Sequence, residues 1–105
     1  MTKKRIAAAS TDGIHVDAHF GKAERFLIYD VGDKILWVED RFSQPLSVGD
    51  PNHSFDPEKF NRIASLLKDC DQVYVSKIGE TPAAKLKAIG IEPVIFEGLI
   101  GDIRW

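Results

Sequence analysis

The side chains in this sequence best suited to bind a metal or act as a nucleophile are three histidines and one cysteine. The histidines are His15, His19 and His53. Because Cys70 is the only cysteine among 105 residues, neither an intramolecular disulfide nor a Cys-x-x-Cys metal site can form. The scattered histidines do not supply the closed four-ligand shell of a structural zinc site. A serine nucleophile, Ser10 or Ser76, paired with a histidine base lacks any flanking signature. These residues therefore match none of the catalytic or metal-binding patterns considered.

Several other chemistries are excluded by what the sequence lacks. It has no Gly-x-x-x-x-Gly-Lys-Ser/Thr and no Gly-x-Gly-x-x-Gly phosphate-binding loop. A formal net charge of −2 argues against nucleic acid as the main partner. No apolar run approaches the ~20 residues of a membrane span, and the basic start precedes too short an apolar stretch for a signal peptide. We expect a cytoplasmic protein with no membrane and no nucleic-acid partner.

Composition and apolar patterning predict one α/β domain over residues 1–105. Its 44% hydrophobic and 29% charged residues are typical of a globular chain of this length. Helices are expected after the N-caps Asp56 and Thr81, each followed by a proline, and Gly90 ends the second. Gly32 and Asp33 form a two-residue hairpin turn. Strands are expected at residues 5–10, 26–31, 34–42, 72–76 and 92–96.

The resulting order is β-β-β-α-β-α-β. Right-handed crossovers make the last three strands parallel, and the turns make the second strand antiparallel to its neighbours. Pro93 places the last strand at an edge of the sheet. This predicts a mixed five-stranded sheet with flanking helices, similar to the ribonuclease H-like motif. A nuclease of that fold needs clustered carboxylates for two metal ions, and the first strand has none.

This topology gathers polar residues at one end of the sheet. All three histidines, two glycine-bearing turns and both helix N-termini are expected there, where α/β sheets bind ligands and helix N-termini favour anions. Cys70 is expected at the opposite end, as a buried residue. Phe20, Phe26 and Trp37 are more simply explained as core than as a stacking platform. Two alternatives remain open: a small-anion or nucleotide-binding module, and a protein-interaction domain without metal.

Two segments resemble one known family. The opening IAAASTDGIHVDAHFGKAERFLIYDV and the later DCDQVYVSKIGETPAAKLKAIGIEPVIFEG resemble the dinitrogenase iron-molybdenum cofactor biosynthesis family, of the NifX/NifB type. The similarity covers nearly the whole chain except residues 44–57. It implies the same ribonuclease H-like fold. It also implies a non-enzymatic carrier, in nitrogen fixation, for the iron-molybdenum cofactor or an iron–sulfur precursor cluster, acting with cofactor-assembly proteins, so we expect a binding protein and not an enzyme.

The resemblance also implies a site. His19 is the principal expected ligand, with His15 and His53 as helpers, and Phe20 and Gly21 shape its loop. The neighbouring walls are Ser10, Thr11, Asp12, Gly13, Ile78 and Gly79. The chain lacks the radical-SAM domain and cysteine motif of the cluster-building enzyme. Relatives often continue into a further helix after the last strand, whereas none is expected here, so Trp105 is expected to cover the exposed sheet face or a homodimer interface.

Overall fold

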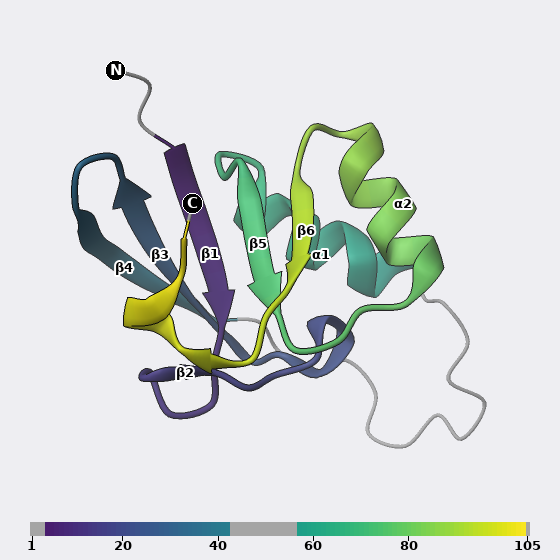
Figure 1. The fold of residues 1–105 in the computed structure, drawn as a ribbon. Coiled ribbons are helices and arrows are strands. Elements are labelled where there is room, and N and C mark those ends of the chain that lie inside the picture. The colour runs from purple at the N-terminus through teal and green to yellow at the C-terminus, as the bar shows by residue number, and fades with distance from the viewer. Residues whose placement is uncertain (1–3, 43–56, 105) are drawn as a thin grey trace.

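A mixed five-stranded sheet forms the centre of the fold (Figure 1). The computed structural model describes residues 4–42 and 57–104. The sheet order is β4-β3-β1-β5-β6, with β1, β5 and β6 parallel and β3 antiparallel to both β1 and β4. This confirms the predicted ribonuclease H-like arrangement, including β6 as an edge strand. The strands are β1 Lys4–Ala9, β3 Arg25–Val31, β4 Ile35–Phe42, β5 Gln72–Val75 and β6 Glu92–Ile95.

Two helices, α1 (Pro57–Leu67) and α2 (Glu80–Ala88), cover one face of the sheet. The inward residues of α1 recur at helical spacing and pack on the alternate strand residues that point to the same face. Leu86 of α2 joins the same core. The apolar residues of α1 in this core are Phe60, Ile63, Ala64 and Leu67.

The predicted ends of the helices are partly confirmed. Gly90 follows the C-cap of α2 with φ +89°, as expected of a glycine in that position. Thr81 is not an N-cap, because α2 begins at Glu80 and Gly79 is its N-cap. Pro82 is tolerated throughout the first helical turn, whose N–H groups have no partner within the helix, so a proline alone does not fix the boundary. The other predicted N-cap, Asp56, lies outside the described residues.

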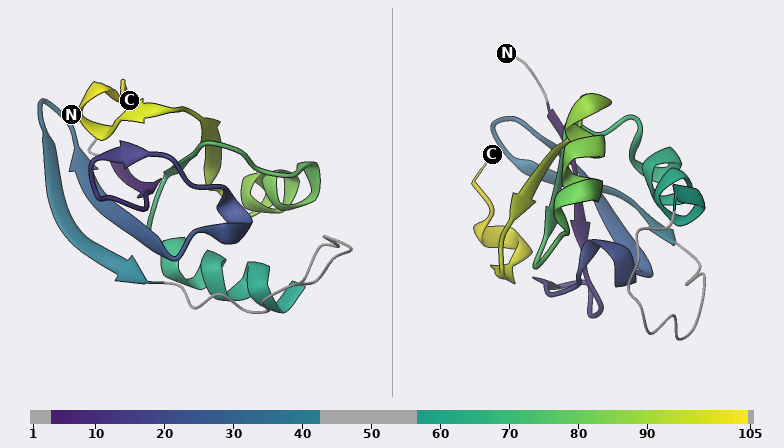
Figure 2. Two further views of the ribbon diagram at one scale, coloured as in Figure 1. Left: turned by 90° about the horizontal axis from the view of Figure 1, so that it is seen from below. Right: turned by 90° about the vertical axis from the view of Figure 1, so that its right-hand side faces the viewer.

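The other face of the sheet is covered by a second, two-stranded sheet that the sequence patterns did not predict. β2 (His15–Val16) pairs antiparallel with β7 (Gly98–Leu99), and a 3-10 turn, η2 (Ile100–Asp102), follows. Figure 2 shows this C-terminal segment and α1 on opposite sides of the sheet. Ile100 and Ile103 are buried in a second apolar core with residues of β1 and β3. Described residues therefore occupy the face expected to be exposed, whereas Trp105 lies outside them.

The prediction that Trp37 belongs to the core is wrong. Its strand, β4, is the other edge of the sheet, and 61% of Trp37 is exposed. The layers that bury the central strands do not cover this side chain, and its indole N–H donates to Asp40 at 2.8 Å. Phe20 and Phe26 are buried, as predicted. The turn between β3 and β4 spans residues 32–34, one more than predicted, because β4 begins at Ile35.

Candidate functional site

The segment from His15 to Phe20 alternates between exposed and buried residues. Val16, Ala18 and Phe20 are buried, whereas the residue that precedes each of them is exposed. An extended chain points successive side chains to opposite faces, so a polar residue at every second position lies on one face. The exposed residues are His15, Asp17 and His19.

Backbone hydrogen bonds hold this segment against the end of β5. The Ser76 N–H donates to the Ala18 carbonyl at 3.0 Å, and the Phe20 N–H donates to the Lys77 carbonyl at 2.9 Å. At its other end, His15 pairs with Leu99 across the small sheet. The polar face is therefore fixed by contacts with two segments from the second half of the chain.

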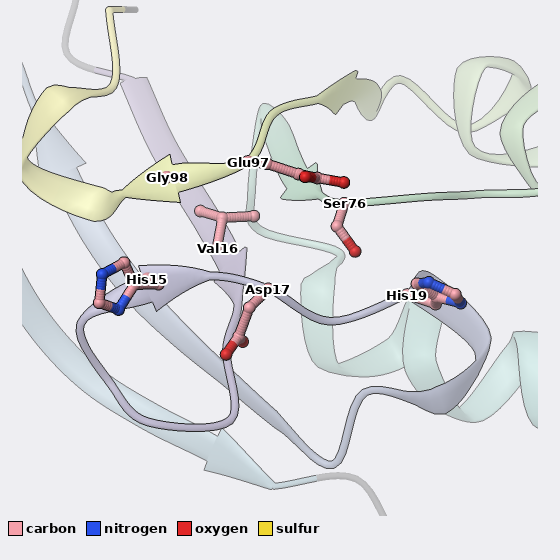
Figure 3. Close-up of a pocket in the computed structure, with 7 residues that line it drawn as sticks. All are labelled: His15, Val16, Asp17, His19, Ser76, Glu97 and Gly98. Atoms are coloured by element: carbon pink, nitrogen blue, oxygen red, sulfur yellow. The ribbon is translucent and has the colours of Figure 1, made fainter.

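A pocket of about 360 Å³ opens along this polar face. In Figure 3, His15 and His19 lie at its two ends with Asp17 between them. Its volume is near the lower end of the roughly 300–1,000 Å³ typical of small-ligand sites. The lining residues are His15, Val16, Asp17, His19, Ser76, Glu97 and Gly98.

One imidazole in the pocket has a defined partner. The Nδ1 atom of His15 lies 2.7 Å from Oδ2 of Asp12. Hydrogen bonds from the backbone N–H groups of His15 and Ile14, followed by the His15 ring, hold the pKa of Asp12 well below its usual range. A carboxylate oxygen accepts hydrogen bonds, so this geometry matches a ring that donates from Nδ1. The other ring nitrogen of His15, Nε2, does not take part in this contact.

The pocket presents imidazole and carboxylate groups. Asp17 accepts hydrogen bonds from the Thr11 backbone N–H at 2.8 Å and from the Thr11 hydroxyl at 2.6 Å. Glu97 is exposed and adds a second carboxylate. None of the pocket's described lining residues is lysine or arginine. Imidazole nitrogens and carboxylate oxygens are metal ligands, whereas two carboxylates repel a free anion.

The described side chains do not form a binding site for a single metal ion. Among residues 4–42 and 57–104, no group of three or more His, Cys, Asp or Glu side chains is placed to hold one ion. At ~3.3 Å per extended residue, the backbone positions of His15 and His19 are separated by roughly 13 Å. The two rings therefore lie at separate ends of the pocket (Figure 3).

Only some of the predicted site residues line the pocket. Of the expected ligands, His15 and His19 line the pocket, and His53 lies outside the described residues. Thr11 and Asp12 do not line the pocket but hydrogen-bond to lining residues, Asp17 and His15 respectively. Ser10 hydrogen-bonds to Asp12, and Gly13 has a positive φ in the same turn. The others do not line the pocket: Phe20 is buried in the core, Gly21 lies in an exposed turn, Ile78 packs against the core and Gly79 caps α2.

Sequence reasoning did not assign Asp17, Ser76, Glu97 and Gly98 to the site. A usable signal was present, because β5 and β6 are parallel to β1 and their carboxyl ends reach the same edge of the sheet. Ser76 directly follows β5, and Glu97 lies two residues beyond β6. Cys70 precedes β5 at the far end and is buried, as predicted.

Comparison with known proteins identifies similar sequences across nearly all of the chain. The family model described as "Dinitrogenase iron-molybdenum cofactor" matches residues 2–103. The FeMo cofactor biosynthesis protein NifB of Chlorobaculum tepidum is 33% identical over 100 residues, covering 92% of this chain and 22% of that protein. Protein NifX of Azotobacter vinelandii is 34% identical over 96 residues, covering 89% of this chain and 56% of that protein. The chain thus spans less than two thirds of either relative.

Solved structures agree with the fold. PH0822 superposes with a TM-score of 0.68 at 23% identity, covering 93% of this chain and 84% of that one. The Thermotoga protein TM1290 gives a TM-score of 0.59 at 24% identity, with 92% and 80% covered. At these identities the likeness establishes the architecture alone. Among the described residues, no helix is long and apolar enough to cross a membrane.

Proposed function

The chain belongs to the dinitrogenase iron-molybdenum cofactor family, and from this we propose that it acts in cofactor biosynthesis as a non-enzymatic carrier of a metal cluster. The cargo is the iron-molybdenum cofactor or an iron–sulfur precursor. The partners are the cofactor-assembly proteins that supply and receive it. The observation that carries the proposal is the polar face of residues 15–19, which turns two imidazoles and a carboxylate toward one pocket.

The donor set of the pocket fits such a cargo. Conventional iron–sulfur sites use cysteine thiolates, and the only cysteine, Cys70, is buried at the other end of the sheet. Imidazole and carboxylate groups instead offer a few N and O contacts to exposed metal atoms. The wide separation of His15 and His19 favours a polynuclear ligand over a single ion. A small number of such bonds suits a protein that must release what it binds.

Within this site we assign the principal ligand role to His19. Its ring lines the pocket, and no hydrogen bond to another described residue fixes which of its two nitrogens carries the proton, so either one can face a ligand. His15 is the second ligand, and Asp17 lies between the two rings (Figure 3). His53 stays a predicted helper, outside the described residues.

The small-anion or nucleotide alternative is less well supported. A free phosphate or molybdate needs positive charge or several converging N–H donors. The described lining has two carboxylates and no lysine or arginine. Binding through metal atoms offsets this repulsion, because the carboxylates then serve as ligands.

Anaerobic reconstitution of the whole protein with iron, sulfide and molybdate tests the proposal. We expect a visible charge-transfer band, retained after desalting, that is lost in His19→Ala. Lys22→Ala is the matched control, since Lys22 is exposed in the same turn and does not line the pocket. Retention of the full band by His19→Ala would contradict the assigned ligand.

Two outcomes would favour the alternatives instead. If no band forms and phosphate or molybdate alone raises the melting temperature, the anion-binding function replaces the carrier function. If neither ligand changes the spectrum or the melting temperature, the pocket does not bind cargo and the proposal fails. The protein-interaction alternative then predicts a partner that binds independently of His19.

A further inference from the structure

We propose that Asp12 is a positioning residue that makes Nε2 the metal-binding atom of His15. This rests on the proposed function and extends it from a ligand residue to a ligand atom. Either ring nitrogen of a neutral histidine can bind metal, and the hydrogen bond made by one determines which is free. A carboxylate behind a metal-binding histidine also orients the ring and raises its basicity.

The two oxygens of Asp12 have separate tasks. Oδ1 accepts hydrogen bonds from the backbone N–H groups of Ile14 and His15, each at 2.8 Å, and shapes the turn. Oδ2 faces the ring and lies 2.7 Å from Nδ1 of His15. The turn is thus satisfied by one oxygen, whereas the other orients the imidazole.

Further contacts limit the freedom of this pair. Ser10, which is only 2% exposed, donates from its hydroxyl to Asp12 Oδ1 at 3.2 Å and accepts from the Gly13 N–H at 2.8 Å. The backbone of His15 is fixed by its pairing with Leu99. Since the Asp12 carboxylate and the His15 backbone are both held, the main remaining freedom is rotation of the ring, which the Oδ2 contact opposes.

Asp12→Asn separates the two tasks. The asparagine carbonyl can still accept from the backbone N–H groups, so the turn can be kept. Its amide group would then face Nδ1 and donate to it, because an NH₂ group cannot accept. In the neutral ring the proton would move to Nε2 and occupy the atom that we assign to the metal.

The first measurement needs no cargo. At about pH 9, where a histidine of ordinary pKa is neutral, ¹⁵N NMR reports which ring nitrogen of His15 carries the proton. We expect the Nδ1–H tautomer in the wild type and mainly Nε2–H in Asp12→Asn. A wild-type ring with the proton on Nε2 would overturn the proposal.

The second measurement is uptake of an iron–sulfide cluster, reconstituted anaerobically and followed by its visible band. Loss of a carboxylate behind a metal-binding histidine typically weakens metal binding 10–100-fold, so we expect Asp12→Asn to weaken cluster binding at least tenfold. Asp33→Asn, in the exposed turn between β3 and β4, is the matched control and should bind as the wild type does.

A double-mutant cycle distinguishes positioning from a general effect on structure. If Asp12 acts through His15, Asp12→Asn should add nothing to the defect of His15→Ala. An additive loss, or wild-type binding by Asp12→Asn, would overturn the proposal while leaving a carrier based on His19 intact. If the wild type takes up no cluster, the proposed function fails and the metal-binding role of Nε2 falls with it. The NMR result then still decides whether Asp12 fixes the ring.

Discussion

The backbone N–H of Phe20 donates a 2.9 Å hydrogen bond to the carbonyl oxygen of Lys77. This bond ties the segment bearing His19 to the residue that follows Ser76 at the end of β5. Phe20 itself is buried, with its ring centroid 6.5 Å from that of Phe26 and 6.1 Å from that of Phe60. The position of His19 therefore depends on how the neighbouring Phe20 packs into the core.

Phe20→Ala should loosen the site as well as the core. Truncation of a buried phenylalanine costs about 3–5 kcal/mol, and here it also removes the side chain that fixes the residue next to His19. We expect a large decrease in the free energy of unfolding by urea titration, and reduced cluster uptake under conditions where the variant is still folded. Lys22→Ala, on the exposed side of the same turn, should change stability by less than about 0.5 kcal/mol. Wild-type uptake by folded Phe20→Ala would show that the core does not position His19.

Gly13 is predicted to resist substitution. Its φ is +79°, and a Cβ atom there would lie 3.1 Å from Nη2 of Arg25. Gly13→Ala should therefore destabilise the protein by about 1 kcal/mol or more, since alanine disfavours this conformation. Gly21→Ala is a matched control, because a Cβ at Gly21 meets nothing within 4 Å. Equal unfolding midpoints for the two variants would contradict this interpretation.

The ion pairs of Asp69 predict a specific pH dependence. Hydrogen bonds from Arg41, then from Arg5, hold the pKa of Asp69 well below its usual range. A carboxylate with a lowered pKa in the folded state stabilises the protein above its unfolded pKa of about 3.9, and this contribution is lost as the pH falls. Asp69→Asn should therefore be less stable than the wild type at pH 7, with the difference shrinking toward pH 2.

Urea titrations at several pH values measure this difference. Because Asp69 is partly exposed, the effect at pH 7 should be modest. Asp33→Asn, whose side chain makes no ion pair among the described residues, provides the baseline. A difference that stays constant from pH 7 to pH 2 would contradict the assignment to Asp69.

Cys70 should be unreactive in the folded protein. Burial raises the pKa of its thiol to about 12, so very little thiolate, the reactive form, exists at pH 8. We expect slow alkylation by iodoacetamide in native buffer and rapid alkylation in denaturing urea, measured by mass spectrometry. Similar rates in the two conditions would show that this end of the sheet opens readily.

The central architecture could be predicted because local signals agree with one another. Apolar strands, turn glycines and the right-handed crossover rule lead to one mixed five-stranded sheet with its last strand at an edge, and the structure confirms this. Trp37 was assigned wrongly because hydrophobicity alone does not tell a central strand from an edge strand. The small sheet of β2 and β7 was missed because two-residue strands have no periodicity to detect.

The site could be predicted only in part, for a similar reason. The polar alternation of His15, Asp17 and His19 is visible in the sequence, but its meaning depends on knowing that the segment is extended. Glu97 enters the pocket through the connection between β6 and β7, and that connection depends on the unpredicted small sheet. The contact between Asp12 and His15 is local in sequence, although its geometry is set by the turn at Gly13.

The pairing of His15 with Leu99 joins two residues that are synthesised at different times. Chains are made from the N-terminus, so the histidine face of residues 15–19 leaves the ribosome long before Gly98 and Leu99 exist. The pocket is then incomplete, because Gly98 and Glu97 form part of its lining. A nascent chain thus lacks the complete pocket until β7 has been translated, so the pocket can form only after most of these residues have been synthesised.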